Sequence, residues 1–451
     1  MENTVLLRRT TYICTAVAFG GLLFGFDTAV ISGAIGLIKN EFALNTLQEG
    51  WLVSSGLAGC ILGVVISGAL SDRVGRKRTI LLSALAFLLS GIGCGLAGNI
   101  DILITARIIG GVGVGMASVV SPMLIAELAP ADKRGRMIAY YQLAITLGIL
   151  LAYFSNAFFV SWGQAHGSTE LWRPMFLAMI VPSVIFLLLL IRIPESPRWL
   201  IKMHRGEQAL AVLQRIRSAG VAASELVEMQ RAAVRAVEQK RSLWSGAFRL
   251  PLLIGILLAV FQQFSGINAI IYYGPGIFEK AGIGGGNALV FQVIIGVINL
   301  LFTLVAIRWS DRLGRKFLLK TGLTGIILSL AFCGILFYTG HTQGISLLVL
   351  LMIYIACFAF SLGPVTWIII NEIFPTEVRV QAVSICTLAL WVAVWLVGQF
   401  FPWLLEKAGP AITFWMFCGF SVLNFLFSWK VVKETKGKTL EEMETIFIAP
   451  H

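Results

Sequence analysis

The stretch Asp72-Arg73-Val74-Gly75-Arg76-Lys77 returns 239 residues later as Asp311-Arg312-Leu313-Gly314-Arg315-Lys316. A second pair, Glu127-x-x-Pro130-x-x-x-Arg134 and Glu372-x-x-Pro375-x-x-x-Arg379, is offset by 245 residues. In each half of the chain the first motif follows the second long apolar segment, and the second motif follows the fourth. Basic loops alone would explain the arginines, but they would not explain acids at fixed spacing in both halves. The sequence therefore predicts two halves that are built alike and run in parallel.

The composition of the 451 residues is typical of a membrane protein. Apolar and aromatic residues make up 57% and charged residues only 13%, which is about half the charged share of an average soluble domain. The mean hydropathy of +0.86 agrees. A water-soluble protein of this length needs far more polar surface. These figures exclude a disordered chain, a disulfide-bonded secreted module and an ordinary cytosolic enzyme.

Twelve apolar segments are long enough to cross a bilayer as helices. They lie at about 11–38, 49–71, 79–98, 102–126, 137–160, 174–192, 252–278, 288–309, 317–339, 345–373, 380–404 and 410–432. The predicted fold class is an all-α membrane protein with twelve transmembrane helices in two pseudo-symmetric six-helix bundles. Two bundles related by an axis along the membrane normal are the layout of rocking secondary transporters.

The predicted domains follow from these segments. They are an N-terminal six-helix bundle (1–192), a cytoplasmic helical linker (193–250), a C-terminal six-helix bundle (251–432) and a cytoplasmic tail (433–451). In the linker, Arg205–Arg217 is expected to form a helix with Leu210, Leu213 and Ile216 on one face. A second amphipathic helix is expected over Ser224–Arg241, with Ser224 as its N-cap.

The net charge of +12 is distributed unevenly over the loops. We count 30 of the 35 Lys and Arg residues on one side, in the N-terminal tail, five loops and the C-terminal tail. This positive-inside bias orients membrane helices, so both termini are expected in the cytoplasm. The charge therefore reflects topology and not nucleic-acid binding. The seven cysteines lie in or beside apolar segments without paired spacing, which indicates neither a disulfide framework nor a metal cluster.

Two ionisable residues lie well inside the predicted spans, Asp27 and Arg107. An ionised side chain at the centre of a membrane helix costs about 2.5–3.5 kcal/mol, so such residues usually face a cavity or each other. Arginine stays protonated, but a carboxylate whose distance to the arginine changes with conformation can bind and release a proton. We therefore expect the pair to couple transport to protons. A purely structural ion pair, or an Asp exposed in an outer vestibule, is the alternative.

Neutral hydrogen-bonding side chains gather in the spans that would face the interface between the halves. Trp367 lies beside Gly363-Pro364, where the helix should bend, and Trp391 would add an aromatic surface. Sugar hydroxyls need neutral donors and acceptors between apolar or aromatic walls. A single Asn is as often a contact between helices, but six such groups favour a polyol site: Gln142, Gln262, Gln263, Asn268, Tyr272 and Asn299.

The acids and arginines of the repeated motifs lie near span ends on the predicted cytoplasmic side. Carboxylate–guanidinium pairs are directional, so a network that bridges the halves would hold the inside closed and break on opening. Gly75 and Gly314 would allow tight turns there. Ordinary topogenic charge is the competing interpretation. The predicted gate consists of Asp72, Arg73, Arg76, Glu127, Arg134, Glu195, Arg198, Asp311, Arg312, Arg315, Glu372 and Arg379.

Over nearly its whole length the chain resembles the sugar porters of the major facilitator superfamily. The Asp-Arg-x-Gly-Arg-Lys loops indicate only the superfamily, whereas Pro194-Glu-Ser-Pro-Arg-Trp-Leu200 and Gln262-Gln-Phe-Ser-Gly-Ile-Asn268 are specific to this branch. The resemblance implies coupling roles for Asp27 and Arg107, and sugar contacts at the polar positions above and at Phe24. Around Asp27 the chain is similar to bacterial proton–xylose symporters, while facilitative carriers generally have a neutral residue there.

Three positions depart from the pattern of that family. Ile149 stands where xylose-type symporters have Gln, and Leu390 and Val394 replace polar residues of the eleventh span. A substrate hydroxyl that loses its partner costs about 1–3 kcal/mol. Xylose or glucose therefore cannot be assumed, and a different hexose, a pentose or a cyclitol such as inositol stays open.

The sequence thus predicts a carrier that imports a monosaccharide or related polyol with protons by alternating access. A facilitative uniporter on the same fold is the alternative; a membrane sugar sensor or an organic-solute exporter is less favoured. No enzyme signature is present, because the four His lack metal spacing and Gly110–Gly115 lacks the strand and Lys of a phosphate loop. We expect a monomer in the cell membrane, with no cofactor, metal or nucleic-acid partner.

Overall fold

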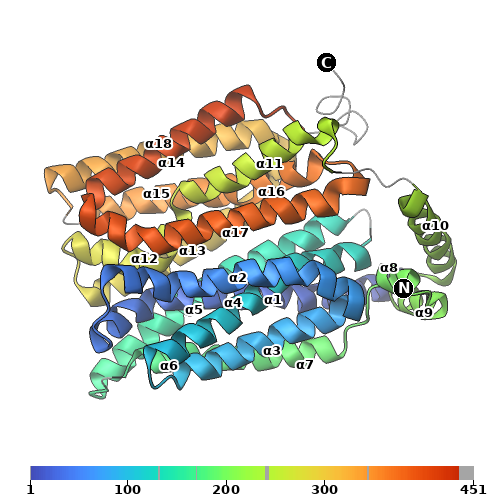
Figure 1. Ribbon diagram of the computed structural model, residues 1–451, viewed down its shortest axis with the longest axis horizontal. Coiled ribbons are helices and arrows are strands. Elements are labelled where there is room, and N and C mark those ends of the chain that lie inside the picture. The colour runs from blue at the N-terminus through green and yellow to red at the C-terminus, as the bar shows by residue number, and fades with distance from the viewer. Residues whose placement is uncertain (1, 131–132, 169, 239–242, 343–344, 436–451) are drawn as a thin grey trace.

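The structure of the protein is a computed structural model that describes residues 2–130, 133–168, 170–238, 243–342 and 345–435 (Figure 1). Within these ranges the side chains of 2–4, 232–233, 235–238, 285, 310–312, 376–377 and 380 are not described. The described residues form helices and connecting turns, with no strand among them.

Among the described residues, twelve helical segments are long and apolar enough to cross a membrane, as the sequence predicts. The N-terminal half contains α1 (Glu2–Glu41), α2 (Thr46–Val74), α3 (Arg76–Gly95), α4 (Ile100–Leu128), α5 (Arg134–Ala165), α6 (Trp172–Leu177) and α7 (Ile180–Ile191). The C-terminal half contains α11 (Gly246–Phe264), α12 (Ile267–Lys280), α13 (Gly285–Leu313), α14 (Arg315–Thr339), α15 (Ser346–Phe360), α16 (Leu362–Glu372), α17 (Thr376–Lys407) and α18 (Gly409–Lys430). The sixth, seventh and tenth spans each consist of two helices.

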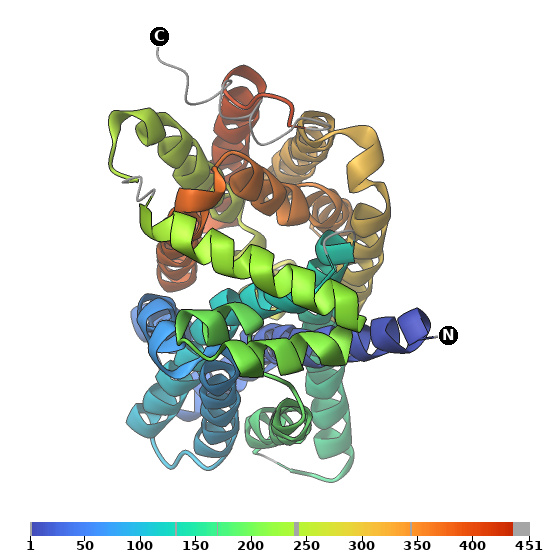
Figure 2. The same ribbon diagram turned by 90° about the vertical axis from the view of Figure 1, so that its right-hand side faces the viewer.

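The two halves lie side by side, one below the other in Figure 1. The linker helices α8 (Pro197–Lys202), α9 (Gly206–Ile216) and α10 (Ala219–Glu238) lie at one end of both halves. Figure 2 looks onto this end and shows the linker helices crossing it. We call it the basic end, because the turns at Gly75 and Gly314 lie there with their Arg and Lys neighbours. The end where α1 passes to α2 is the opposite end.

The tenth span breaks one helical turn before Pro364. Pro364 cannot donate a backbone hydrogen bond to the carbonyl of Phe360 and would clash with it. Helix α15 accordingly ends at Phe360, and α16 begins at Leu362 after Ser361. The expected distortion is therefore present, but it lies one turn earlier than Gly363-Pro364. The seventh span breaks at Gly266, whose φ of 91° lies in the left-handed region.

The linker differs from its prediction in three respects. Helix α8, which the sequence analysis did not identify, begins with Ser196 as N-cap, whose hydroxyl accepts from the N–H of Trp199. In α9 the buried face carries Ala209 besides the predicted Leu213 and Ile216, and Leu210 is only half-buried.

The predicted N-cap at Ser224 is wrong. Helix α10 begins five residues earlier, at Ala219, and the Ser224 hydroxyl donates to the carbonyl of Val221 from within the helix. Serine suits both places, since its hydroxyl bonds nearby backbone groups in caps and helices alike.

Gly266→Ala should destabilise the fold by about 1–3 kcal/mol, because an L residue is strained at this φ. A Cβ there would also lie 2.7 Å from the ring of Phe417. The control is Gly276→Ala in α12, which would meet nothing within 4 Å. Thermal unfolding in detergent should show a lower melting temperature for Gly266→Ala alone, and equal melting temperatures would contradict the strain.

Candidate functional site

Asp27 of α1 and Arg107 of α4 lie against each other inside the N-terminal half. One guanidinium nitrogen, Nη1, is 3.4 Å from Asp27 Oδ1 and 3.3 Å from the Asp27 carbonyl oxygen. Both side chains are at most 5% exposed. A well-formed charge-assisted bond is shorter, about 2.7–2.9 Å, and Arg107 Nε is buried without a hydrogen-bond partner among the described residues. The pair is thus close but incompletely satisfied.

Two glycines make room for this pair. A Cβ on Gly56 of α2 would lie 2.8 Å from Arg107 Nη2, and one on Gly110 of α4 would lie 3.1 Å from Asp27 Oδ1. Glycine thus lets the backbones of α2 and α4 approach the buried charges. Gly110 belongs to the Gly-rich run Gly110–Gly115, and its contact with Asp27 gives this member of the run a packing role.

The amides of the seventh span form a hydrogen-bonded chain across its helix break. Gln262 Nε2 donates to the carbonyls of Leu362 (2.7 Å) and Gly363 (3.3 Å) at the break of the tenth span. Gln263 Nε2 donates to Gln262 Oε1, and Asn268 Nδ2 donates to Gln263 Oε1 at 2.6 Å. The structure therefore brings three of the predicted polyol-binding residues together, and ties them to the backbone of a neighbouring helix.

The aromatic candidates lie partly on the interface of the halves. Phe24 of α1 and Trp391 of α17 approach with ring centroids 5.5 Å apart, which places one from each half in contact. Tyr272 is buried and meets the ring of Tyr273 edge-on. Asn299 of α13 is also buried. Gln142 and Trp367 are half-buried.

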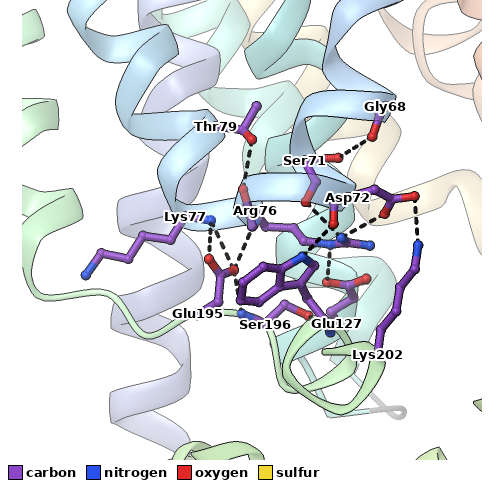
Figure 3. Close-up of polar contacts among 12 residues, drawn as sticks. Gly68, Ser71, Asp72, Arg76, Lys77, Thr79, Glu127, Glu195, Ser196 and Lys202 are labelled. Carbon is purple, nitrogen blue, oxygen red and sulfur yellow. Dashed lines mark hydrogen bonds and ion pairs between the residues drawn. The ribbon is translucent and has the colours of Figure 1, made fainter. Parts of the chain in front are cut away.

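At the basic end of the N-terminal half, Arg76 joins the repeated motifs (Figure 3). Its guanidinium lies 3.0 Å from Asp72 Oδ1 and 3.4 Å from Glu127 Oε2. Glu195 accepts from the backbone N–H groups of Arg76 (2.9 Å) and Lys77 (3.1 Å), at the start of α3. An anion is stabilised there by the free N–H groups and dipole of the helix.

The glycine of this turn leaves space for the capping acid. Gly75 has a φ of 101°, and a Cβ on it would lie 2.2 Å from Glu195 Oε2. Lys202 of α8 lies 2.9 Å from Asp72 Oδ2, so the linker is held to the end of α2. The predicted role of Gly75 as a tight turn agrees with this geometry.

The C-terminal half repeats the arrangement with an acid that sequence reasoning missed. Arg315 lies 3.0 Å from Glu372, and Glu434 accepts from the N–H groups of Arg315 and Lys316, each at 3.0 Å. Gly314 has a φ of 90°. Glu434 follows Glu195 by 239 residues, the offset of the Asp-Arg-x-Gly-Arg-Lys repeat. This equal offset could have identified Glu434 in the sequence as the counterpart of Glu195.

The remaining gate residues are placed as follows. Arg379 donates to the carbonyl of Phe374, and Arg73 and Arg198 are exposed. The buried Nε of Arg134 has no hydrogen-bond partner among the described residues. Asp311 and Arg312 lie outside the described side chains. The ion pairs between described gate residues each lie within one half, and Lys202 of the linker pairs with Asp72 of the N-terminal half. A bridge between the halves stays a prediction.

Direct hydrogen bonds between the halves occur at the opposite end, where the sequence analysis identified no site. The hydroxyl of Ser54 in α2 donates to Gln399 Oε1 of α17 at 2.5 Å, and Gln399 Nε2 donates to the carbonyl of Leu47 at 3.2 Å. Thr46 donates to Glu406 nearby. Gly50 permits this approach, because a Cβ there would lie 2.1 Å from the carbonyl oxygen of Gln399.

Glu195→Gln should lower the melting temperature, at a cost of about 1–2 kcal/mol, because the amide keeps the shape but loses the charge that helix α3 stabilises. Glu434→Gln should cost about as much, since it accepts the matching N–H groups. The control is Glu228→Gln, an exposed carboxylate in the middle of α10 and away from any helix N-terminus. Thermal unfolding of the three variants in detergent tests this, and a cost for only one of the two capping acids would contradict their equivalence.

Comparisons with known proteins agree with this architecture. A family model described as "Sugar (and other) transporter" matches residues 13–447. The arabinose-proton symporter of Bacillus subtilis is 43% identical over 97% of this chain and 94% of its own length. The D-xylose-proton symporter of Escherichia coli is 38% identical over 96% and 95%.

Solved structures are also similar. The proton:xylose symporter XylE of the major facilitator superfamily, bound to 6-bromo-6-deoxy-D-glucose, matches with a TM-score of 0.81 and 37% identity over 97% of this chain and 99% of that chain. The inward open conformation of XylE from Escherichia coli matches with a TM-score of 0.83 and 36% identity over 96% and 99%. The chain therefore belongs to the sugar transporter family of the major facilitator superfamily, whose members are membrane carriers and not enzymes.

Proposed function

We propose that this protein imports a monosaccharide together with protons by alternating access. The observation that carries the proposal is the buried pair of Asp27 and Arg107, because a uniporter has no need of a titratable carboxyl in this place. The contact of 3.4 Å is longer than a strong ion pair and Arg107 keeps an unpaired donor. A small change in their separation would therefore change how readily Asp27 takes up a proton.

The contacts between the halves support a state that is closed at the opposite end. Ser54, Gln399 and Gly50 bring α2 and α17 together there. We propose that the basic end faces the cytoplasm, as the Lys and Arg distribution predicts. The substrate would then leave through the basic end, after the predicted gate network has opened.

A pentose is the substrate class we favour. The amide chain Gln262–Gln263–Asn268 offers donors and acceptors for hydroxyls, whereas Ile149, Leu390 and Val394 are buried and apolar. A sugar with one hydroxyl fewer than a hexose leaves fewer groups unpaired, each of which costs about 1–3 kcal/mol. Two of the similar proteins are named as arabinose and xylose symporters, which supports the same class.

Asp27→Asn should abolish sugar-driven alkalinisation of the medium and accumulation against a gradient, because an amide cannot carry the proton. Exchange of labelled sugar across the membrane should persist. The measurement is external pH and uptake in cells expressing each variant.

Asp101→Asn provides the matched control, an exposed carboxylate on the same helix as Arg107. It should leave both signals unchanged. Accumulation that survives Asp27→Asn would remove Asp27 from the mechanism, and a wild-type protein that exchanges sugar without alkalinisation would be a uniporter.

Counterflow in proteoliposomes loaded with unlabelled sugar should identify the substrate. We expect labelled arabinose or xylose to enter at least tenfold faster than glucose, galactose or inositol, since about 1.4 kcal/mol of lost hydrogen bonding is a factor of ten. Empty liposomes are the control. Faster entry of a hexose or of inositol would overturn the pentose assignment and leave the coupling mechanism intact.

A further inference from the structure

In α12 one backbone carbonyl, that of Ile271, has no donor within its own helix. Pro275 lies inside this helix and has no N–H to donate to the carbonyl four residues earlier, that of Ile271. In the low-dielectric interior of a membrane protein such a carbonyl needs another donor, and neighbouring helices supply it.

Two buried side chains from different halves donate to this carbonyl. The hydroxyl of Tyr153, on α5 of the N-terminal half, lies 3.2 Å from the Ile271 oxygen. Nε2 of Gln292, on α13 of the C-terminal half, lies 3.1 Å from the same oxygen. Each side chain is only 1% exposed, so water does not compete for the bonds.

The surrounding glycines accommodate both donors. A Cβ on Gly296 of α13 would lie 2.9 Å from Cδ2 of the Tyr153 ring, and one on Gly274 of α12 would lie 2.0 Å from Gln292 Oε1. The two residues therefore occupy a space that exists only because their neighbours lack side chains. This indicates a built contact and not an accidental approach of two surfaces.

We propose that Tyr153 is a positioning residue for transport, an inference that rests on the proposed function. Ile271 directly precedes Tyr272, and α12 also carries Asn268. Pro275 leaves the Ile271 carbonyl without a donor from its own helix, and the Tyr153 hydroxyl of the N-terminal half donates to it. This bond holds the candidate sugar contacts of α12, Asn268 and Tyr272, against the N-terminal half while the opposite end is closed. When the halves separate there, Gln292 stays with the carbonyl, because it belongs to the same half.

The labelling rate of a cysteine introduced as Ser54→Cys tests the proposal. This position is buried between α2 and α17 and reacts with a maleimide only when the opposite end opens. All variants carry this substitution, and the chain with only its native cysteines gives the background. Tyr153→Phe should raise the rate about fivefold, since it removes one hydrogen bond worth about 1 kcal/mol between the halves.

Tyr141→Phe is the matched control. It removes a buried hydroxyl from the same helix, one with no hydrogen-bond partner among the described residues, and it should not change the rate. Pro275→Ala supplies the missing N–H to the Ile271 carbonyl. In that background Tyr153→Phe should raise the rate less than twofold.

Two results would overturn the proposal. These are a Tyr153→Phe rate equal to that of Tyr141→Phe, and an equal increase with and without Pro275. Melting temperatures check that each variant is folded. Labelling requires no sugar, so failure of the proposed transport would appear in the uptake assays and not here.

Discussion

In a lipid bilayer every backbone N–H and C=O must find a partner within the protein, because no water is present to supply one. Continuous helices meet this requirement by themselves, whereas a broken helix does not. The tenth span breaks at Ser361, three residues before Pro364, and the seventh breaks at Gly266. Polar side chains collect at the breaks. The Ser361 hydroxyl donates to the carbonyl of Cys357 at the end of α15, and Gln262 donates to the carbonyls of Leu362 and Gly363 at the start of α16.

The need to pair buried polar groups also fixes the side-chain conformations of the candidate sugar site. Gln262, Gln263 and Asn268 are bonded in series, so their orientations are fixed before any substrate arrives. A ligand that binds such groups must replace existing hydrogen bonds, but it does not have to order free side chains. Discrimination between sugars then depends on whether each hydroxyl finds a group already pointing toward it. Buried apolar residues such as Leu390 are not able to provide one.

The sequence predicted what depends on long averages and internal repetition. The twelve spans and the division into two similar halves follow from hydropathy and from the two repeated motifs. It missed what depends on single tertiary contacts. The start of α10 could not be predicted from Ser224, because serine occurs both at helix caps and within helices. The hydrogen bond between Ser54 and Gln399 could not be predicted, because it joins residues 345 positions apart in the sequence. Glu434 could be predicted in part. Its offset from Glu195 is visible in the sequence, but its hydrogen bonds to the N–H groups at the start of α14 are seen only in the structure.

The two ends of the molecule are stabilised differently, and this difference bears on how a carrier alternates. Among the described residues, the ion pairs of the basic end join groups of one half and its linker, whereas the bonds between the halves come from the hydroxyls of Thr46, Ser54 and Tyr153 and the amide of Gln399. Each such hydrogen bond contributes about 0.5–1.5 kcal/mol. A few of them can hold one end closed without making the opposite arrangement inaccessible. The ion pairs can then keep each half rigid while the weak interface between them opens. A ligand shifts this balance only by the difference between its affinities for the two arrangements.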